Sequence, residues 1–368
     1  MTMKIGIITF HRAQNYGAVL QAYALLEKVS QSGHSVSIID YRQKTIEENY
    51  RLISFKRAIG KNPFKGIIRI YNEIRTYKKR KNLYKKYLVF FKKRFHLQKN
   101  KELRSSLFTG YDLLIIGSDQ IWNPFITNGF DSIYWGYIPS SSNIKIVTYA
   151  ASLGITELTN DQKNYISKAL ANFSLISVRE HYLKDLLTPL TNKLIYEVVD
   201  PTLLLTSSEW KRIITPVSIS VPYVLVYQLR KHPFIRQKAE QIAKEINGIV
   251  IELSPGLKQW PISHGTIIDA SPTEFLALMA SATCVVTSAF HGTVFSIIFN
   301  RPFYTFQFHD FDDSRVISLL NELGLSERLI DENSHFSFSE LDYTEVDKKI
   351  ENLREYAVNF LNKCYETV

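Results

Sequence analysis

Residues 283–298 read TCVVTSAFHGTVFSII. The stretch opens with a run of β-favouring residues that ends at Thr287, which is typical of a buried parallel strand. It closes with apolar residues at helical spacing, from Val294 to Ile298. We expect Gly292 to allow the tight turn between them, through a backbone conformation that other residues adopt only at a cost. The stretch therefore predicts a strand, a turn and the start of a helix.

This order places His291 at the carboxyl end of a strand and the amino end of a helix. In open α/β sheets ligands bind in that crevice, and the unpaired amides and dipole of a helix N-terminus favour an anion. A phosphate or a carboxylate is the expected ligand. The alternative is a structural histidine that only caps the turn, because such junctions are frequent in α/β proteins.

Strands and helices alternate along the rest of the chain, which is typical of doubly wound α/β domains. Strands are expected at Lys4–Thr9, Val36–Ile39, Asp112–Ile116, Ile144–Tyr149, Leu175–Val178, Tyr223–Gln228, Ile249–Leu253, Thr283–Thr287 and Phe303–Phe306. Helices are expected from about Ala18, and at Asp161–Phe173, Phe234–Ile246, Thr273–Ala280, Asp313–Leu323 and Glu345–Tyr365. We predict two Rossmann-like domains facing across a cleft, at 1–205 and 206–340, with a final helix in 341–368 that packs back on the first domain.

Composition narrows the class of protein. The chain has 368 residues, 45% of them hydrophobic, which suits two domains with sizeable cores. Its two cysteines predict neither a disulfide scaffold nor a thiolate metal site, so the cytoplasm is the expected compartment. Residues 1–10 are too short for a signal core, and no uninterrupted apolar run reaches about 18 residues. The loop after the first strand lacks the glycine pattern of dinucleotide binders, so no nicotinamide or flavin cofactor is expected.

The net charge of +10 is concentrated between Lys56 and Arg104, where 18 Lys and Arg residues face two acidic ones. Apolar residues three and four apart predict amphipathic helices in this basic insertion. Such helices suit the surface of an anionic membrane. The residues assigned to this membrane patch are Lys78, Lys79, Arg80, Lys85, Lys86, Lys92 and Lys93. Nucleic acid is the rival partner, but no recognised binding motif accompanies the charge and we expect none; a solvated helical insertion is the plain alternative.

Polar residues follow two of the strands in the first half. Asp119 comes after an apolar run, where it serves either as a base for an acceptor hydroxyl or as a helix cap. The loop after the first strand offers His11, Gln14 and Asn15, whose donors and acceptors suit sugar hydroxyls or an anion. A polar turn that merely caps the next helix is equally consistent with that loop.

Several motifs resemble, in order, those of the polysaccharide pyruvyl transferase family. The first is Asn15-Tyr16-Gly17-Ala18-Val19-Leu20-Gln21, and the second is Gly117-Ser118-Asp119-Gln120-Ile121-Trp122-Asn123. Ser177-Val178-Arg179-Glu180 and Asp200-Pro201-Thr202 follow. The last motif runs from Thr287 to Thr293 and continues through Phe295-Ser296 to Asn300-Arg301-Pro302-Phe303. The resemblance spans residues 3 to 330.

This resemblance implies a GT-B-like architecture and an enzyme without cofactor or metal. Phosphoenolpyruvate would donate a pyruvyl group to two hydroxyls of one sugar, forming a cyclic ketal and releasing phosphate. The acceptor would be a sugar of a bacterial surface polysaccharide such as a capsule or exopolysaccharide, on a polyprenyl-diphosphate-linked intermediate at the inner face of the membrane.

The resemblance assigns a role to Arg179, and the chemistry of the donor together with residue positions suggests roles for the others. The family's equivalent of Arg179 lies at the donor site, and Arg315 is a second candidate cation for the donor's carboxylate and phosphate. His291 would hold the phosphate or protonate the donor, and Asp119 would act as base, with Glu180 as the substitute. Further predicted substrate contacts are Ser288, Gly292, Thr293, Asn15 and Gly17.

Two other functions remain open from sequence. A glycosyltransferase that uses a nucleotide sugar would share the architecture. A non-enzymatic scaffold would make the basic insertion the functional part, in which case replacing His291 would leave function intact while charge reversal at Lys78, Lys79 and Arg80 would abolish it.

Overall fold

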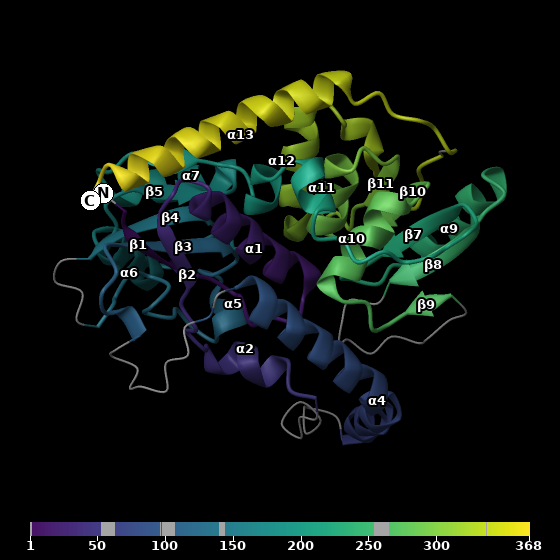
Figure 1. The fold of residues 1–368 in the computed structure, drawn as a ribbon, viewed down its shortest axis with the longest axis horizontal. Coiled ribbons are helices and arrows are strands. Elements are labelled where there is room, and N and C mark those ends of the chain that lie inside the picture. Colours follow the sequence, from purple (N-terminus) through teal and green to yellow (C-terminus); the bar gives the residue numbers. More distant parts are fainter. Residues whose placement is uncertain are drawn as a thin grey trace.

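The computed structural model describes residues 2–52, 63–95, 97, 107–139, 144–253, 265–335 and 337–368. Of the predicted basic insertion at 56–104, residues 56–62, 96 and 98–104 lie outside this part of the chain. The described elements form two α/β halves, and a long C-terminal helix runs over both of them (Figure 1).

The first half is built on a six-stranded parallel sheet with the order β2-β1-β3-β4-β5-β6. Its strands are β1 (Lys4–Ile8), β2 (Ser35–Ile38), β3 (Leu113–Asp119), β4 (Lys145–Ala151), β5 (Ile176–Val178) and β6 (Ile195–Glu197). The apolar run Leu113–Ile116 is fully buried, as expected for a central parallel strand covered on both faces. The chain moves from β1 to β2 on one side and to β3 on the other. The strand order therefore reverses between β1 and β3.

The second half repeats the plan with the order β12-β11-β10-β7-β8-β9, again all parallel. Its strands are β7 (Tyr223–Tyr227), β8 (Ile249–Leu253), β9 (Thr266–Ile267), β10 (Cys284–Thr287), β11 (Phe303–Phe306) and β12 (Leu329–Ile330). This is the strand order of the Rossmann fold, with its reversal between β7 and β10. The first sheet follows the flavodoxin-like order instead. The predicted fold class, two facing doubly wound halves, is confirmed.

Helices connect the strands and cover the sheets. They are α1 (Tyr16–Ser30), α2 (Lys44–Asn49), α4 (Pro63–Arg94), α5 (Pro124–Thr127), α6 (Asn160–Leu170), α7 (His181–Leu187), α8 (Ser207–Lys211), α9 (Pro233–Glu245), α10 (Pro272–Ser281), α11 (Phe290–Ile298), α12 (Ser314–Leu323) and α13 (Thr344–Tyr365). The helix expected at Thr273–Ala280 begins with a capping box, in which Ser271 Oγ accepts from Glu274 N and Glu274 Oε2 accepts from Ser271 N. Gly324 ends α12 in a left-handed conformation.

Aromatic packing joins the two halves. The ring of Tyr16, at the start of α1, stacks on Phe275 of α10 with centroids 4.6 Å apart. Its hydroxyl donates to the backbone oxygen of Ala270 at 2.8 Å. Near the end of the chain, Phe360 of α13 contacts Tyr149 and Tyr196, which belong to the first sheet. The amino end of α1 is therefore fixed against the second half.

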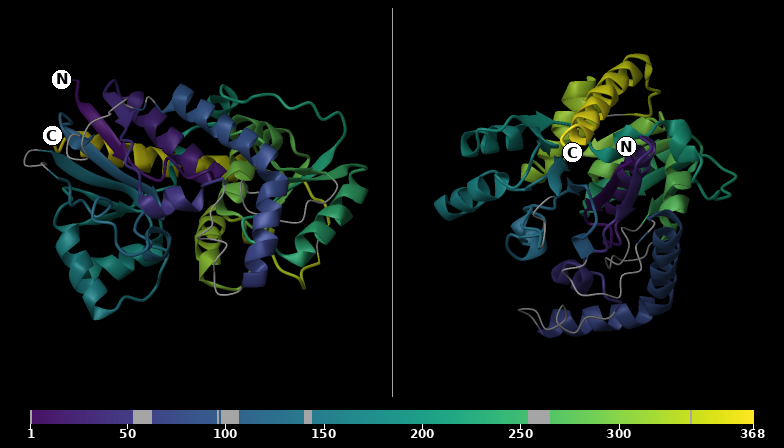
Figure 2. Two further views of the ribbon diagram at one scale, coloured as in Figure 1. Left: turned by 90° about the horizontal axis from the view of Figure 1, so that it is seen from below. Right: turned by 60° about the vertical axis from the view of Figure 1, so that its left-hand side comes forward.

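Within the described residues, the basic insertion forms the 32-residue helix α4. It lies on the outside of the molecule, across the side where the two halves meet (Figures 1 and 2). Its apolar stripe is buried in the protein at Leu83, Tyr87, Phe90 and Phe91. The predicted amphipathicity is therefore confirmed for this part of α4, where the apolar face packs on the protein core, whereas Tyr71 and Ile74 nearer its amino end are 64% exposed.

Two members of the predicted membrane patch also lie in this junction. Arg80 is buried, at 4% exposure, and Lys86 Nζ lies 2.8 Å from Glu274 Oε2, the capping carboxylate of α10. Arg80 does not belong to an exposed surface, so its assignment to the patch is wrong. Lys78, Lys79, Lys85, Lys92 and Lys93 are exposed. None of the helices in the described ranges is long and apolar enough to cross a membrane.

Candidate active site

A pocket of about 870 Å³ lies between the carboxyl ends of the two sheets. Both reversals of strand order open onto it. From the first half, the loops after β1 and β3 contribute Gln14, Asn15 and Asp119. From the second half, the segments after β7 and β10 contribute Arg230 and His291. Open α/β sheets bind ligands at such switch points, and here two of them meet in one pocket.

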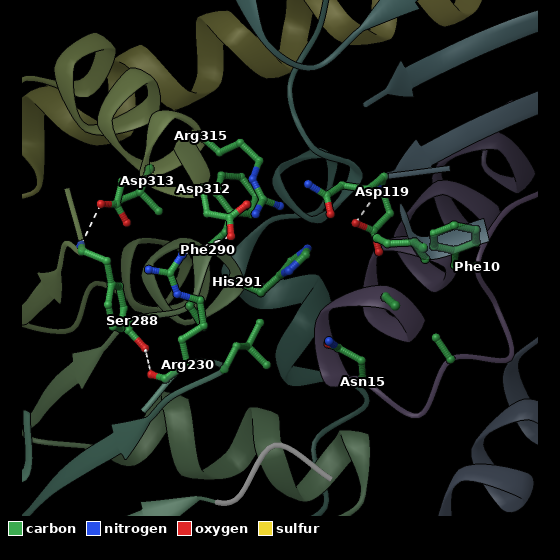
Figure 3. A pocket seen from close by; sticks show the side chains of 18 of the residues that line it. Phe10, Asn15, Asp119, Arg230, Ser288, Phe290, His291, Asp312, Asp313 and Arg315 are labelled. Carbon is green, nitrogen blue, oxygen red and sulfur yellow. Dashed lines mark hydrogen bonds and ion pairs between the residues drawn. The ribbon is translucent and has the colours of Figure 1, made fainter. Parts of the chain in front are cut away.

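His291 lies at the centre of this pocket, in the first turn of α11 (Figure 3). It is held from both sides and only 6% exposed. On one side the backbone of Gly17 lies so close that a Cβ atom there would stand 2.1 Å from His291 Nδ1. On the other side His291 Nε2 lies 3.5 Å from Asp200 Oδ2, an electrostatic contact too long for a strong hydrogen bond. The imidazole therefore has little freedom to rotate.

Behind His291 lies a buried network of charges. Asp200, whose side chain is fully buried, also accepts a hydrogen bond from Arg179 Nη1 at 2.8 Å. Arg179 Nε donates to Glu180 Oε1 at 2.9 Å, and Ser152 Oγ donates to the same oxygen. A further hydrogen bond from Thr202 Oγ1 completes the shell around Asp200. Asp200 thus connects the imidazole on α11 to the arginine at the end of β5.

The pKa of Asp200 reflects this setting. Burial alone would raise the pKa, but the charges of His291 and Arg179, with the hydrogen bond from Thr202, outweigh it and hold the pKa well below its usual range. Burial would lower the pKa of Arg179, but Glu180 and Asp200 raise it above its usual value. Both groups are therefore ionised at neutral pH, and Asp200 presents a fixed negative charge to the imidazole.

Phe290 separates this network from the pocket. Its ring lies 5.0 Å from the guanidinium carbon of Arg179 and 6.0 Å from that of Arg315, both at cation–π distance. Phe290 and Arg315 line the pocket, whereas Arg179 does not. Within the described residues Arg315 makes no ion pair or hydrogen bond. It is therefore the arginine of the pocket wall that is available to an anionic ligand.

Arg230 is a second arginine on the wall, and the sequence analysis did not single it out. Its guanidinium is paired with Asp310 and Asp312 and lies 3.8 Å from the ring centre of Phe308. Its backbone oxygen accepts a hydrogen bond from Ser288 Oγ at 2.9 Å. Ser288 lines the pocket as predicted, but its hydroxyl already donates its hydrogen to the backbone of Arg230.

On the opposite wall, Asp119 and Asn15 each make a local backbone contact. Asp119 Oδ1 accepts from Gln120 N at 2.9 Å, and Asn15 Oδ1 accepts from Gly17 N at 2.9 Å as the N-cap of α1. Both side chains line the pocket, so capping and a functional role are compatible for Asn15. Asp119 does not cap the following helix, since the N-cap of α5 is Asn123. His11 does not reach it, because its ring nitrogens contact Asp40 and the backbone oxygen of Thr9.

The structure brings five of the predicted site residues to the pocket wall and leaves five away from it. On the wall are His291, Asp119, Arg315, Ser288 and Asn15. Arg179 and Glu180 lie in the buried network, Thr293 is fully buried against Thr305, Gly292 packs under the turn, and Gly17 supports His291. Gly292 has helical backbone angles, so the expected reason for it is wrong. A Cβ atom there would lie 2.1 Å from Thr287 Oγ1, and close approach is what requires glycine.

Sequence reasoning missed Asp200 as a site residue. It was quoted only as part of a motif and as the end of the first half, yet it joins His291 to Arg179. Its one local signal is a carboxylate directly after an apolar run and before a proline, which is too common to indicate a site. In the described ranges, no three His, Cys, Asp or Glu side chains group as metal ligands.

Comparison with known proteins gives one family and several similar folds. The profile of a family described as "Polysaccharide pyruvyl transferase" matches residues 15–309. No curated protein matches the chain. A UDP-GlcNAc 2-epimerase from Methanocaldococcus jannaschii is 12% identical, covering 95% of this chain and 92% of its own, with a TM-score of 0.48. A putative UDP-N-acetylglucosamine 2-epimerase from Listeria monocytogenes is 8% identical, covering 96% of this chain and 88% of its own, with a TM-score of 0.46. The glycosyltransferase SnogD from Streptomyces nogalater is 10% identical, covering 97% of this chain and 95% of its own, with a TM-score of 0.41.

Proposed function

Because the chain belongs to the polysaccharide pyruvyl transferase family, we propose that it transfers a pyruvyl group from phosphoenolpyruvate to two hydroxyls of one sugar in a bacterial surface polysaccharide. The observation that carries this proposal is the position of His291. It lies at the amino end of α11 in a pocket between the two halves, and the same wall carries Arg315, which has no ion-pair partner among the described residues. Such a wall suits a small molecule that carries both a carboxylate and a phosphate.

The donor is anionic at both ends, and several groups of the pocket favour an anion, although Asp119, Asp312 and Asp313 also line it. Arg315 supplies a planar guanidinium for bidentate binding of a carboxylate or phosphate. The amino ends of α1 and α11 both begin at the pocket, where their dipoles favour negative charge. Arg179 acts from behind, by holding the Asp200 carboxylate that faces His291. In this assignment Arg179 is a positioning residue.

The reaction exchanges bonds without oxidation or reduction. A proton adds to the methylene carbon of the enol and makes it a methyl group. One sugar hydroxyl bonds to the neighbouring carbon, the bond from that carbon to the phosphate oxygen breaks, and a second hydroxyl of the same sugar closes the ketal. The two hydroxyls release two protons, one of which balances the new methyl group while the other leaves with inorganic phosphate.

Two pocket residues have the chemistry for these proton transfers. His291, facing Asp200, is suited to hold the phosphate as an imidazolium or to deliver the proton to the enol. Asp119 on the opposite wall is suited to take the proton of the attacking hydroxyl. Glu180, the predicted substitute for Asp119, is buried against Arg179 away from the pocket wall, so we assign it no proton transfer.

The acceptor is proposed to be a sugar on a polyprenyl-diphosphate carrier, which places the enzyme at the inner face of the cell membrane. The exposed lysines of α4 support this part of the proposal: Lys78, Lys79, Lys85, Lys92 and Lys93. Each basic residue close to an anionic leaflet contributes roughly 1 kcal/mol to binding. Attraction would be mainly electrostatic, because Leu83, Tyr87, Phe90 and Phe91 of this helix are buried, with Tyr71 and Ile74 as its exposed apolar side chains.

The test of this function is product formation. Incubation of the protein with phosphoenolpyruvate and lipid-linked galactose, glucose or N-acetylmannosamine acceptors should release inorganic phosphate and form a ketal methyl group visible by NMR. Absence of both products with every acceptor would contradict the proposal. A thermal shift with UDP- or GDP-sugars and none with phosphoenolpyruvate would favour a nucleotide-sugar glycosyltransferase instead.

A further inference from the structure

The two walls of the pocket differ in chemistry. Every basic residue that lines it in the described chain belongs to the second half: Arg230, His291 and Arg315. The same wall also carries two acidic residues, Asp312, which pairs with Arg230, and Asp313, which accepts a hydrogen bond from the backbone N of Phe308. The first-half wall carries one charged residue, Asp119. The remainder of that wall consists of amide, aromatic and aliphatic side chains, namely Phe10, Ala13, Gln14, Asn15, Ala18, Ile46, Asn49, Tyr50, Gln120, Phe125 and Ile126. An anionic ligand therefore fits the second-half wall, next to Arg315, whereas a neutral polar ring fits the first-half wall.

Phe125 is the most exposed large hydrophobic side chain of the described residues, at 83%, although it lines the pocket. Its backbone is held firmly in the short helix α5. Asn123 Oδ1 accepts from Phe125 N at 2.9 Å, and Pro124 occupies the first turn. An aromatic ring on a fixed backbone at the edge of a pocket offers an apolar surface that a ligand can cover.

Gln14 provides a second and independent observation. It is only 4% exposed and lines the pocket, yet its Oε1 atom has no hydrogen-bond partner within the described chain. Its Nε2 atom reaches only the backbone oxygen of Tyr50, at 3.5 Å. A buried acceptor without a donor is unfavourable, so the site favours a ligand that brings a hydroxyl hydrogen to this atom.

The neighbouring Tyr50 also favours a hydroxyl-bearing ligand. Burial, with a smaller contribution from the charge of Asp119, raises the pKa of Tyr50 to about 12. Its phenol therefore stays protonated at neutral pH and can donate a hydrogen bond. Together Gln14 and Tyr50 offer one acceptor and one donor on the same wall as Phe125.

We propose that this wall is the subsite for the acceptor sugar: the apolar face of a pyranose ring packs on Phe125, and one of its hydroxyls donates to Gln14 Oε1. The inference rests on the proposed function, and it names the place where the sugar binds. Asp119 and His291 line the same pocket, where they would meet the hydroxyls that react. The anionic donor then occupies the opposite wall.

The experiment compares four variants by steady-state kinetics with phosphoenolpyruvate and the acceptor sugar. Phe125→Ala should raise the KM for the sugar about tenfold, and Phe125→Tyr, which keeps the ring, should restore it. Gln14→Met, which keeps the length but removes the amide, should raise the same KM about fivefold. Neither Phe125→Ala nor Gln14→Met should alter the KM for phosphoenolpyruvate. Leu194→Ala, at a side chain 67% exposed and away from the pocket, is the matched control and should leave every constant unchanged.

Saturation-transfer NMR with methyl galactoside, methyl glucoside and methyl N-acetylmannosaminide gives a readout that does not depend on turnover. At least one glycoside should bind the wild type and lose its signal in Phe125→Ala. Phosphate release with unchanged sugar KM values in Phe125→Ala and Gln14→Met would overturn the subsite and leave the proposed function standing. Glycoside binding that depends on Phe125, without phosphate release, would retain the subsite and reject the reaction. The subsite would also be overturned if none of the glycosides bound the wild type, or if UDP bound at Phe125 in place of a sugar.

Discussion

The backbone of Gly17 packs directly against the imidazole of His291, so that a methyl group on Gly17 would stand 2.1 Å from Nδ1. Gly17 lies in the first turn of α1 in one half, and His291 lies in the first turn of α11 in the other. The first half, through Gly17, therefore holds the imidazole of His291 in place. A change in the relative position of the two halves would alter this contact.

Gly17→Ala should destabilise the protein and reduce its activity, because the added methyl group must displace the imidazole or separate the halves. The cost should resemble other overpacking changes, about 1–3 kcal/mol in the free energy of unfolding. A double-mutant cycle with His291→Ala, measured by urea unfolding, checks the cause. The penalty of Gly17→Ala should disappear once the ring is absent, and an equal penalty in both backgrounds would show that the ring is not what Gly17 accommodates.

Asp200→Asn should lower stability at neutral pH, because it leaves Arg179 buried with one carboxylate fewer; the expected loss is about 3 kcal/mol. Since the pKa of folded Asp200 lies below that of the unfolded chain, its contribution is complete above about pH 4 and is lost as the pH falls further. The stability difference between the wild type and the variant should therefore narrow as the pH falls from about 5 to 3. Urea unfolding at a series of pH values tests this, and a difference that widens toward acid would contradict the assignment.

Arg315→Ala should weaken binding of phosphoenolpyruvate, because it removes the pocket arginine that has no partner among the described residues. The KM for the donor should rise about tenfold or more, and the KM for the sugar should change little. Arg212→Ala removes an exposed arginine away from the pocket and serves as the control. Equal donor KM values in the two variants would remove Arg315 from the donor site.

Charge reversal on α4 should abolish binding to anionic vesicles. The triple change Lys78→Glu, Lys79→Glu and Lys85→Glu alters exposed side chains only, so folding should be preserved. Co-sedimentation with phosphatidylglycerol vesicles, and with phosphatidylcholine vesicles for comparison, measures the effect. The double change Lys163→Glu and Lys168→Glu on α6 is the control. Loss of binding in both variants would indicate unspecific attraction, and undiminished binding of the triple variant would exclude α4.

Much of the fold could be predicted from sequence because its strands are short apolar runs bounded by polar turns. Ile249–Leu253 and Phe303–Phe306 have the predicted bounds. The strands that were missed, β6, β9 and β12, have two or three residues each, too few to show a periodicity. Sequence spacing also could not say which face of α4 is covered, since burial there depends on partners such as Tyr16 and Glu274 from other parts of the chain.

The site was predictable where a residue's position at a strand end determines its surroundings. His291 and Asp119 both follow a strand at a switch point, and both line the pocket. The direction of Arg179 was not predictable in this way, because it depends on Asp200 and Glu180 as buried partners. Phe125 carries no sequence signal, since only the folded structure shows a phenylalanine left exposed beside a pocket.

The proposed role of His291 is tested most directly by the rate of phosphate release from phosphoenolpyruvate, in the presence of an acceptor sugar, by the wild type and by His291→Asn. We expect the variant to keep its unfolding free energy within about 1 kcal/mol while its rate falls about 10²- to 10⁴-fold, the range expected when a group that transfers a proton is removed. A folded His291→Asn variant that releases phosphate at the wild-type rate would contradict this role.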